Sequence, residues 1–308
     1  MALRATRRRL PISAPTGVGI FALRRLAYTN LAACVALCAG TRAPAQGLGV
    51  TDDAGRSVRL AAPAQRVVSL SPAITELLFA LGAGVQVVGR TTWCDYPPAA
   101  RAVPNVGDGL SPNLESILAR HPDLVVLYDS PTNMVATTRL NGLGIAALLL
   151  RQDRLVELAR DARILGRLTG HADRGDSVAA AISSVRQAPA LGLRIAILAW
   201  QNPPTVIGGA SYLDELAALA GAENVFHDLA SPAAVVSLET IAARDPDALV
   251  VFADSGGAGT RPEGLAWQAI RAVRSGRIIV LVGSRFGRPS PRAGEAVVEF
   301  RRLLEAGP

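Results

Sequence analysis

Lysine is absent from this chain, and histidine, cysteine and aromatic residues are scarce. Among 308 residues there are three histidines and three cysteines, and aromatic residues make up 4%. Direct zinc or manganese binding usually needs about three histidine or carboxylate ligands that converge on one point. His121, His171 and His227 include no pair that is close in sequence, so direct binding of a bare metal ion is only a weak hypothesis. The low cysteine count also excludes a metal site built from thiolates.

Because lysine is missing, all positive side-chain charge comes from arginine, and its distribution is uneven. Residues 1–46 contain seven arginines and no acidic residue, whereas the other 25 arginines are balanced by 25 acidic residues. The net charge of +7 therefore belongs to the N-terminal segment. A nucleic-acid-binding surface needs a basic excess within the folded part of a protein, so no nucleic-acid partner is expected.

The N-terminal segment has the pattern of an export signal. Its arginine-rich start is followed by an apolar stretch from Leu26 to Gly40 and by the small-residue sequence Ala43-Pro44-Ala45. This order predicts cleavage near Ala45 and a periplasmic mature protein. The apolar stretch is short for a membrane span, although an uncleaved anchor remains an alternative. A second alternative is lipid attachment at Cys34, which follows two alanines.

The sequence patterns of common enzyme active sites do not occur. There is no Gly-x-Ser-x-Gly turn, phosphate-binding loop or dinucleotide-binding glycine pattern, and Ser211 in GGASYLDEL fits a helix cap better than a catalytic turn. Cleavage near Ala45 leaves Cys94 as the single cysteine, so no intrachain disulfide is possible. A nucleophilic thiol needs a nearby base, and none is evident for Cys94. We expect a protein that is not an enzyme and holds no cofactor.

Short apolar strands alternate with amphipathic helices in two parts of the chain. Val67–Leu70 is a predicted strand, and Ser71-Pro72 then begins a helix that ends near Gly82. The alternation continues to about residue 151, stops in a helical segment at 152–190, and resumes from 191 to the end. This pattern predicts an α/β fold with two similar lobes, each with a mainly parallel sheet flanked by helices. The lobes are an N-terminal lobe (47–151) and a C-terminal lobe (191–308), joined by one long helix.

One phrase is spelled twice, as NLESILARHPD at 113–123 and SLETIAARDPD at 237–247, with seven of eleven positions identical. Each copy predicts a short capped helix that leads through Pro-Asp into a strand. Glu115 and Glu239 occupy equivalent positions, and a carboxylate there offsets the partial positive charge of a helix N-terminus. As a pair on two related lobes, they also form a two-pronged acidic surface that would match a basic partner with two-fold symmetry.

Seven motifs in one order resemble the periplasmic substrate-binding proteins of bacterial ABC importers, in the class that binds vitamin B12 (cobalamin), ferric siderophores or haem. The likeness is closest to the cobalamin-binding members and spans about Arg66 to Leu304. The motifs are SPAITELLFALGAG, TTWCDYPP, NLESILARHPDLVV, AWQNPP, GAENVF, SLETIAARDPD and SRFGRPSPR.

The resemblance implies a class III fold, in which a stiff helix joins two lobes and the ligand lies between them with little domain closure. It also implies a monomer that delivers a metal chelate to a permease dimer, with Glu115 and Glu239 docking onto permease arginines. Trp93, Trp200 and Phe286 correspond to aromatic residues of the family's pocket. The two tryptophans also follow predicted parallel strands, at the sheet edge where ligands of open α/β folds usually bind.

Further ligand contacts are expected from polar residues near these aromatics. Tyr96 is either a contact or part of a rigid turn, and Arg285 and Arg288 lie in a proline-rich loop where guanidinium groups bind carboxylate, phosphate or amide groups. Arg292 in the same loop is an alternative contact or a support for the fold.

The sequence departs from the cobalamin-binding pattern at three positions. Gly109 and Ala233 stand where the family has tryptophan, and Ser284 replaces an acidic residue. We therefore expect a wider and less aromatic pocket. Cobalamin is the leading candidate ligand, and haem or a ferric siderophore is the alternative.

Overall fold

The computed structural model describes residues 47–253 and 261–306. The export signal expected in 1–46, with Ala45 and Cys34, lies outside the described residues. Among the helices that are described, none is both long and apolar enough to cross a membrane.

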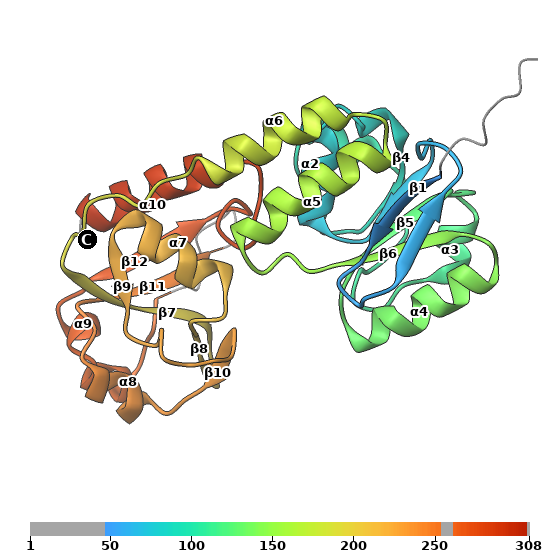
Figure 1. The fold of residues 1–308 in the computed structure, drawn as a ribbon. Coiled ribbons are helices and arrows are strands. Elements are labelled where there is room, and N and C mark those ends of the chain that lie inside the picture. The colour runs from blue at the N-terminus through green and yellow to red at the C-terminus, as the bar shows by residue number, and fades with distance from the viewer. Residues whose placement is uncertain (1–46, 254–260, 307–308) are drawn as a thin grey trace, which may run out of the picture. The chain divides into compact units, whose positions relative to one another are not determined.

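The N-terminal lobe contains a four-stranded sheet in the order β4-β3-β5-β6, with every neighbouring pair parallel. Helices cover both faces of this sheet, as the blue and green part of Figure 1 shows. Alternate residues of β5 point to opposite faces: Leu124 and Val126 pack towards α2 and α5, whereas Val125 and Leu127 pack towards α3 and α4. The elements are the hairpin β1 (Leu48–Thr51) and β2 (Ser57–Leu60), β3 (Val67–Ser69), α2 (Pro72–Ala80), β4 (Val87–Arg90), α3 (Leu114–Leu118), β5 (Leu124–Tyr128), α4 (Pro131–Gly142) and β6 (Ala146–Leu150).

Helix α2 begins where the sequence predicts it, but Ser71 does not cap it through its side chain. Pro72 occupies the first turn, where its missing N–H removes no helical hydrogen bond. The Ser71 hydroxyl instead donates a hydrogen bond of 3.0 Å to the Gln152 side chain. Gly84–Gln86 form a 3₁₀ turn between this helix and the next strand, β4, which starts at Val87.

The segment between the lobes contains two helices, α5 (Leu155–Leu168) and α6 (Ala172–Ser183), which lie side by side (Figure 1). Two glycines allow their close approach: a Cβ on Gly166 would lie 2.9 Å from Cα of Gly175. The sequence predicted one long helix in the second half of this segment, whereas α6 ends at Ser183 and is followed by irregular backbone up to β7.

The C-terminal lobe has a mixed sheet in the order β10-β8-β7-β11-β12, and β9 pairs with the start of β7. Strands β7, β11 and β12 are parallel as predicted, whereas β8 and β10 are antiparallel additions that the sequence pattern did not predict. The elements are β7 (Leu193–Gln201), β8 (Pro204–Ile207), α7 (Tyr212–Ala220), β9 (Ala222–Asn224), β10 (Ala233–Val235), α8 (Leu238–Arg244), β11 (Ala248–Ala253), α9 (Arg271–Arg274), β12 (Ile278–Val282) and α10 (Ala293–Ala306).

One hydrophobic core continues through both lobes. Ile74 of α2 and Leu158 of α5 belong to the same buried cluster as Leu216 of α7 and Phe300 of α10. Two smaller clusters lie under the outer helices, α3 and α4 in the N-terminal lobe and α8 and α9 in the C-terminal lobe. Because the lobes share buried apolar surface, separating them would expose it to water at a free-energy cost.

Candidate ligand-binding cavity

The two copies of the repeated phrase have the same local structure. Asn113 and Ser237 each cap their helix by accepting a backbone N–H three residues later, at 3.0 and 3.2 Å. At the other end, His121 and Asp245 both adopt left-handed backbone, with φ of 47° and 46°. The sequence repeat is therefore also a structural repeat.

The aspartates that end each copy bind the strand beside their own. The Asp123 carboxylate accepts the Arg66 backbone N–H at 3.0 Å just before β3, and the Asp247 carboxylate accepts the Arg194 N–H at 2.9 Å in β7. The arginine side chains return the contact by donating to carbonyl groups at the C-terminus of each short helix. These identities have a structural cause, because they join helix, turn and strand in the same way in both lobes.

Glu115 and Glu239, in contrast, do not bind a neighbouring strand. Both lie at the start of a short helix with exposed side chains. A hydrogen bond with the Ser237 hydroxyl, helped by the backbone N–H of Glu239 itself, lowers the pKa of the Glu239 carboxyl group, so this group stays ionised at neutral pH. The fold thus presents one exposed glutamate per lobe at equivalent positions.

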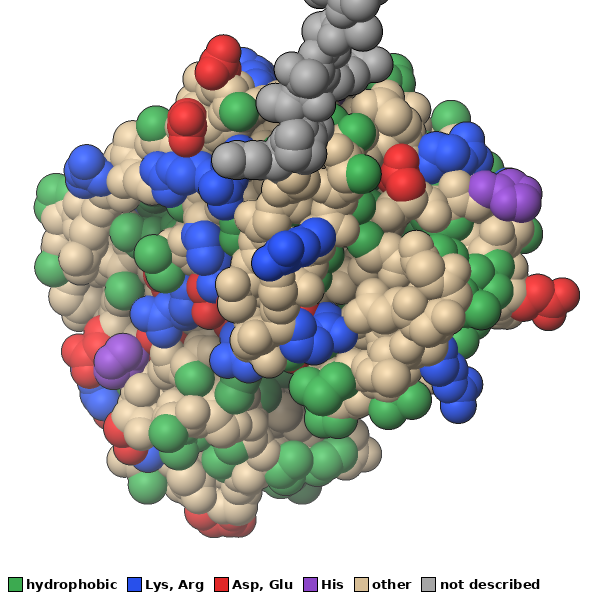
Figure 2. All heavy atoms as spheres, turned by 45° about the vertical axis from the view of Figure 1, so that its right-hand side comes forward, with side chains coloured by type: hydrophobic (Ala, Val, Ile, Leu, Met, Phe, Trp, Pro, Cys, Tyr) green, Lys and Arg blue, Asp and Glu red, His purple; other side chains and the backbone are tan. Residues whose placement is uncertain are grey.

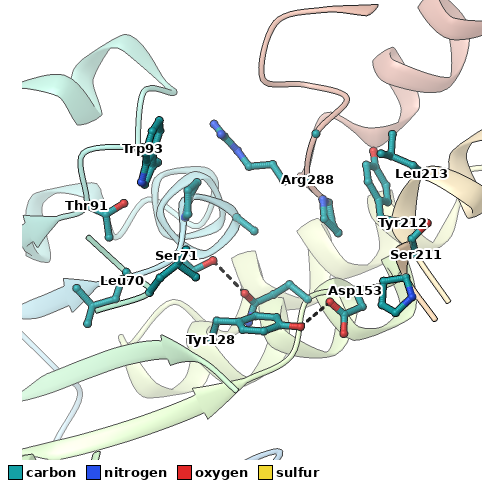
Figure 3. A pocket seen from close by; sticks show the side chains of 18 of the residues that line it. Leu70, Ser71, Thr91, Trp93, Tyr128, Asp153, Ser211, Tyr212, Leu213 and Arg288 are labelled. Carbon is teal, nitrogen blue, oxygen red and sulfur yellow. Dashed lines mark hydrogen bonds between the residues drawn. The ribbon is translucent and has the colours of Figure 1, made fainter. Parts of the chain in front are cut away.

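Residues of both lobes and of the segment between them line a cavity of about 490 Å³. This volume is within the usual range for small-molecule sites, roughly 300–1,000 Å³. In Figure 3, Thr91 and Trp93 lie on the side of the N-terminal lobe, opposite Ser211 and Tyr212 of the C-terminal lobe. The lining consists of Leu70, Ser71, Pro72, Ala73, Thr91, Trp93, Asp108, Gly109, Leu110, Tyr128, Gln152, Asp153, Ala210, Ser211, Tyr212, Leu213, Pro232, Gly287, Arg288 and Pro289.

Two hydrogen-bonded pairs form one polar side of this cavity (Figure 3). The Tyr128 hydroxyl, at the end of β5, donates to Asp153 at 2.8 Å, and the Ser71 hydroxyl donates to Gln152 at 3.0 Å. Burial, reinforced by the hydrogen bond to Asp153, raises the pKa of Tyr128, so the phenol stays protonated and continues to donate.

Arg288 reaches the cavity from the C-terminal lobe and forms ion pairs with the N-terminal lobe. Its guanidinium group lies 2.9 Å from Glu76 and 2.5 Å from Asp95. Although burial pushes the pKa of Asp95 upward, the hydrogen bond and the charge of Arg288 outweigh it and lower that pKa. Arg292 binds the other Glu76 oxygen at 2.9 Å and stacks on the Tyr96 ring with its central carbon 3.7 Å from the ring centroid. Arg292 and Tyr96 thus support the contact between the lobes.

Two of the six predicted ligand-contact residues, Trp93 and Arg288, line the cavity. Trp93 is 62% exposed, so much of its indole surface is free for contact. Trp200 is 72% exposed near the end of β7 but is not part of the lining.

Phe286 is not available to a ligand in this structure, because it is 2% exposed and packs edge-on against Phe300 at 6.3 Å between ring centroids. Its place in the apolar core corrects the expectation that it forms part of the cavity wall. Tyr96 and Arg285 also lie outside the lining.

The glycine at position 109, where the cobalamin-binding pattern has tryptophan, has a structural cause in this fold. A Cβ at this position would lie 2.2 Å from the carbonyl oxygen of Leu70, so any side chain requires the backbone to move. Gly109 itself lines the cavity, which is consistent with a less aromatic wall.

Cys94 is fully buried, and its sulfur contacts the hydroxyls of Thr75 and Thr91 at 3.0 and 3.1 Å. The thiol is therefore inaccessible to solvent.

Most of the polar lining was not predicted from the sequence. Tyr128, Gln152 and Asp153 come just after or at the ends of strands β5 and β6, the same kind of position that drew attention to the tryptophans. Applying the strand-edge rule to every parallel strand would have found them. Tyr212 gave no such signal, because it opens a helix instead of following a parallel strand.

No group of three or more histidine, cysteine or acidic side chains that could hold a metal ion occurs in 47–253 or 261–306. On the face drawn in Figure 2, arginine and acidic side chains are interspersed among apolar and polar ones.

Comparison with known proteins gives a family match over most of the chain. A family model described as "Periplasmic binding protein" matches residues 67–283. The chain is 29% identical over 241 residues to a vitamin B12-binding protein of Pectobacterium carotovorum, which covers 74% of this chain and 84% of the relative.

Solved structures agree with this match. The periplasmic vitamin B12-binding protein of Vibrio cholerae aligns with a TM-score of 0.65 and 25% identity, over 79% of this chain and 98% of that chain. The periplasmic haem-binding protein RhuT from Roseiflexus sp. RS-1 aligns with a TM-score of 0.67 and 24% identity over the same shares, which supports the fold alone.

Proposed function

The chain belongs to the periplasmic binding protein family, and from this premise we propose that it captures a metal-chelate nutrient, with cobalamin as the leading candidate, and delivers it to an ABC permease. It is a periplasmic ABC substrate-binding protein of the vitamin B12, siderophore and haem class, and this class consists of binding proteins rather than enzymes. Haem and ferric siderophores are the alternative ligands.

The observation that carries the proposal is the cavity lined from both lobes, with the exposed face of Trp93 on its wall. A corrin or porphyrin ring is flat, and stacking it against an indole buries roughly 150–250 Å² of aromatic surface. Arg288 contributes a fixed polar group at the same wall. We narrow the proposed ligand contacts to these two of the six residues named from the sequence.

Titration of the purified mature protein with cobalamin, haemin and ferric siderophores tests the proposal, with tryptophan fluorescence as the readout. Trp93→Ala is expected to weaken binding of the preferred ligand at least tenfold and to remove most of the quenching. Trp200→Ala is the matched control, because this indole is exposed to a similar extent and lies outside the cavity lining. If none of the three ligand types binds, or if only Trp200→Ala weakens binding, the proposed ligand class or site is wrong.

Glu115 and Glu239 are the proposed contacts with the permease. Both are exposed acidic side chains at equivalent positions of the two lobes, so they match a partner with two equivalent basic sites. In cells that depend on this protein, Glu115→Ala/Glu239→Ala is expected to abolish uptake while ligand affinity stays unchanged and the melting temperature falls only slightly, because each carboxylate also offsets the positive charge of a helix N-terminus.

A double variant at two other exposed glutamates, Glu223→Ala/Glu305→Ala, is the control and should transport normally. Reduced ligand affinity in the Glu115/Glu239 variant would contradict the docking role.

For export, we propose cleavage near Ala45, with lipid attachment at Cys34 as the alternative. Mass spectrometry of the N-terminus of the secreted protein separates the two.

A further inference from the structure

We propose that this cavity selects its ligand by charge: it accepts a chelate whose peripheral groups are neutral carboxamides and rejects one that carries carboxylates. The inference rests on the proposed function and narrows it. Three features of the lining carry it: the acidic side chains, the state of its single arginine, and the unpaired polar atoms beside them.

Among the described residues of the lining, the acidic and basic side chains are Asp108, Asp153 and Arg288. Asp108 accepts the backbone N–H of Leu110 at 2.7 Å, and Asp153 accepts the Tyr128 hydroxyl at 2.8 Å. Neither carboxylate has a salt-bridge partner among the described residues. A ligand carboxylate that enters this cavity therefore meets two negative charges.

Arg288, the one arginine among the described residues of the lining, cannot offset them, because it is already neutralised. Arg288 holds Glu76, whose side chain is 1% exposed, and also Asp95. Turning Arg288 towards an anionic ligand would leave Asp95 without its charged partner and would remove one of the two arginines that compensate buried Glu76. Breaking buried ion pairs in this way is strongly unfavourable, so Arg288 is a poor anion receptor in this setting.

The same region offers hydrogen-bond donors that carry no charge. Gln152 is 5% exposed; its oxygen accepts from Ser71, and its side-chain nitrogen is buried with no partner among the described residues. The hydroxyl of Tyr212, also 5% exposed, is likewise unpaired there. Buried polar atoms normally have partners. A ligand carbonyl oxygen would satisfy these buried groups once their side chains turn toward the cavity, and a neutral carboxamide supplies that oxygen without the charge that Asp153 would repel.

Two corrin probes of the same ring and metal separate charge from shape. Dicyanocobinamide carries peripheral amides, whereas dicyanocobyrinic acid carries carboxylates at the same positions. Calorimetric titration of the mature protein is expected to show at least thirtyfold tighter binding of the amide form. The preference should shrink as salt is raised, because salt screens charge repulsion, whereas a preference set by shape would not change. Haemin, which has two carboxylates, should bind more weakly than the amide corrin.

Asp153→Asn tests the assignment to a residue, because the asparagine oxygen can still accept the Tyr128 hydroxyl. It is expected to reduce the preference for the amide form at least fivefold, chiefly by improving binding of the carboxylate form. Asp173→Asn, at an exposed position on α6, is the charge-matched control and should leave the preference unchanged. Tyr212→Phe, which keeps the ring but removes the unpaired hydroxyl, is expected to weaken the amide corrin several-fold.

Equal affinity for the two corrins, or tighter binding of the carboxylate form, would overturn the charge selection while leaving the proposed function intact. An unchanged preference in Asp153→Asn would overturn the role of that carboxylate. Failure of every corrin, haem and siderophore to bind would instead refute the proposed function itself, so the two failures are distinguishable.

Discussion

Replacing Glu76 by alanine is expected to destabilise the protein far more than removal of an exposed acidic residue. The Glu76 side chain is 1% exposed and its two oxygens bind Arg288 and Arg292, whose side chains are 18% and 13% exposed. Alanine at this position leaves two guanidinium groups close together with little water to solvate them. Breaking a buried ion pair by removing one partner costs about 3–5 kcal/mol. Because both arginines keep some contact with water and Arg288 keeps Asp95, we expect a loss at the lower end, about 3 kcal/mol.

For a folded part of this size, such a loss lowers the melting temperature by roughly 10 °C. Urea unfolding followed by circular dichroism measures the change in free energy, and a thermal scan measures the shift. Glu76→Gln should lose less, because the amide oxygen can still accept one arginine. Glu299→Ala is the control: it removes an exposed pair with Arg302, and such pairs contribute little. If Glu76→Ala and Glu299→Ala unfold at the same urea concentration, the reasoning about buried charge is refuted.

Two further predictions concern single positions. Gly109→Ala should lower both stability and ligand affinity, because its Cβ would lie 2.2 Å from the Leu70 carbonyl oxygen. Gly142→Ala is the control and should be tolerated, because a Cβ there has nothing within 4 Å. Equal urea unfolding midpoints of the two variants would contradict this prediction. Burial raises the pKa of Asp161 from 3.8 to about 7, so its contribution to stability is fully present below about pH 4 and is lost as pH rises through about 7. The free energy of unfolding of Asp161→Asn should therefore rise relative to that of the wild type by at most about 1.4 kcal/mol per pH unit across that window. If the unfolding free energies of the two proteins change with pH in the same way, the pKa assignment is refuted.

The α/β fold with two helix-flanked sheets was predicted from the sequence, and the match to solved periplasmic binding proteins confirms it. The prediction succeeded for the central parallel strands, because short continuous apolar runs such as Leu124–Tyr128 and Ala146–Leu150 are typical of strands buried on both faces. It missed β8 and β10, which are short and partly exposed, so they lack a strong apolar signal.

The candidate site was predicted less completely. Trp93 was found because it follows a parallel strand, and Arg288 because it lies in a loop with three arginines. Phe286 was placed in the wall by family likeness, yet its neighbour in space is Phe300 on α10. Whether a side chain near a strand end faces a cavity or a core depends on the helix packed beside it, and local sequence does not encode that contact. The pairing of Glu76 with Arg292, 216 positions apart, is of the same kind.

The repeated phrase shows how structural and functional causes of identity can be separated within one chain. The repeated positions Ile117 and Ile241 are buried in the lobe cores, while Asp123 and Asp247 hold the neighbouring strand. These identities are what two copies of one helix–turn–strand unit require. The glutamates are different, since their side chains are exposed, hold no neighbouring strand and contribute only about 0.3–1 kcal/mol at a helix N-terminus. An identity that folding does not demand needs another cause, and a partner that touches both lobes in the same way supplies one. This is why the docking proposal depends on Glu115 and Glu239 rather than on the repeat as a whole.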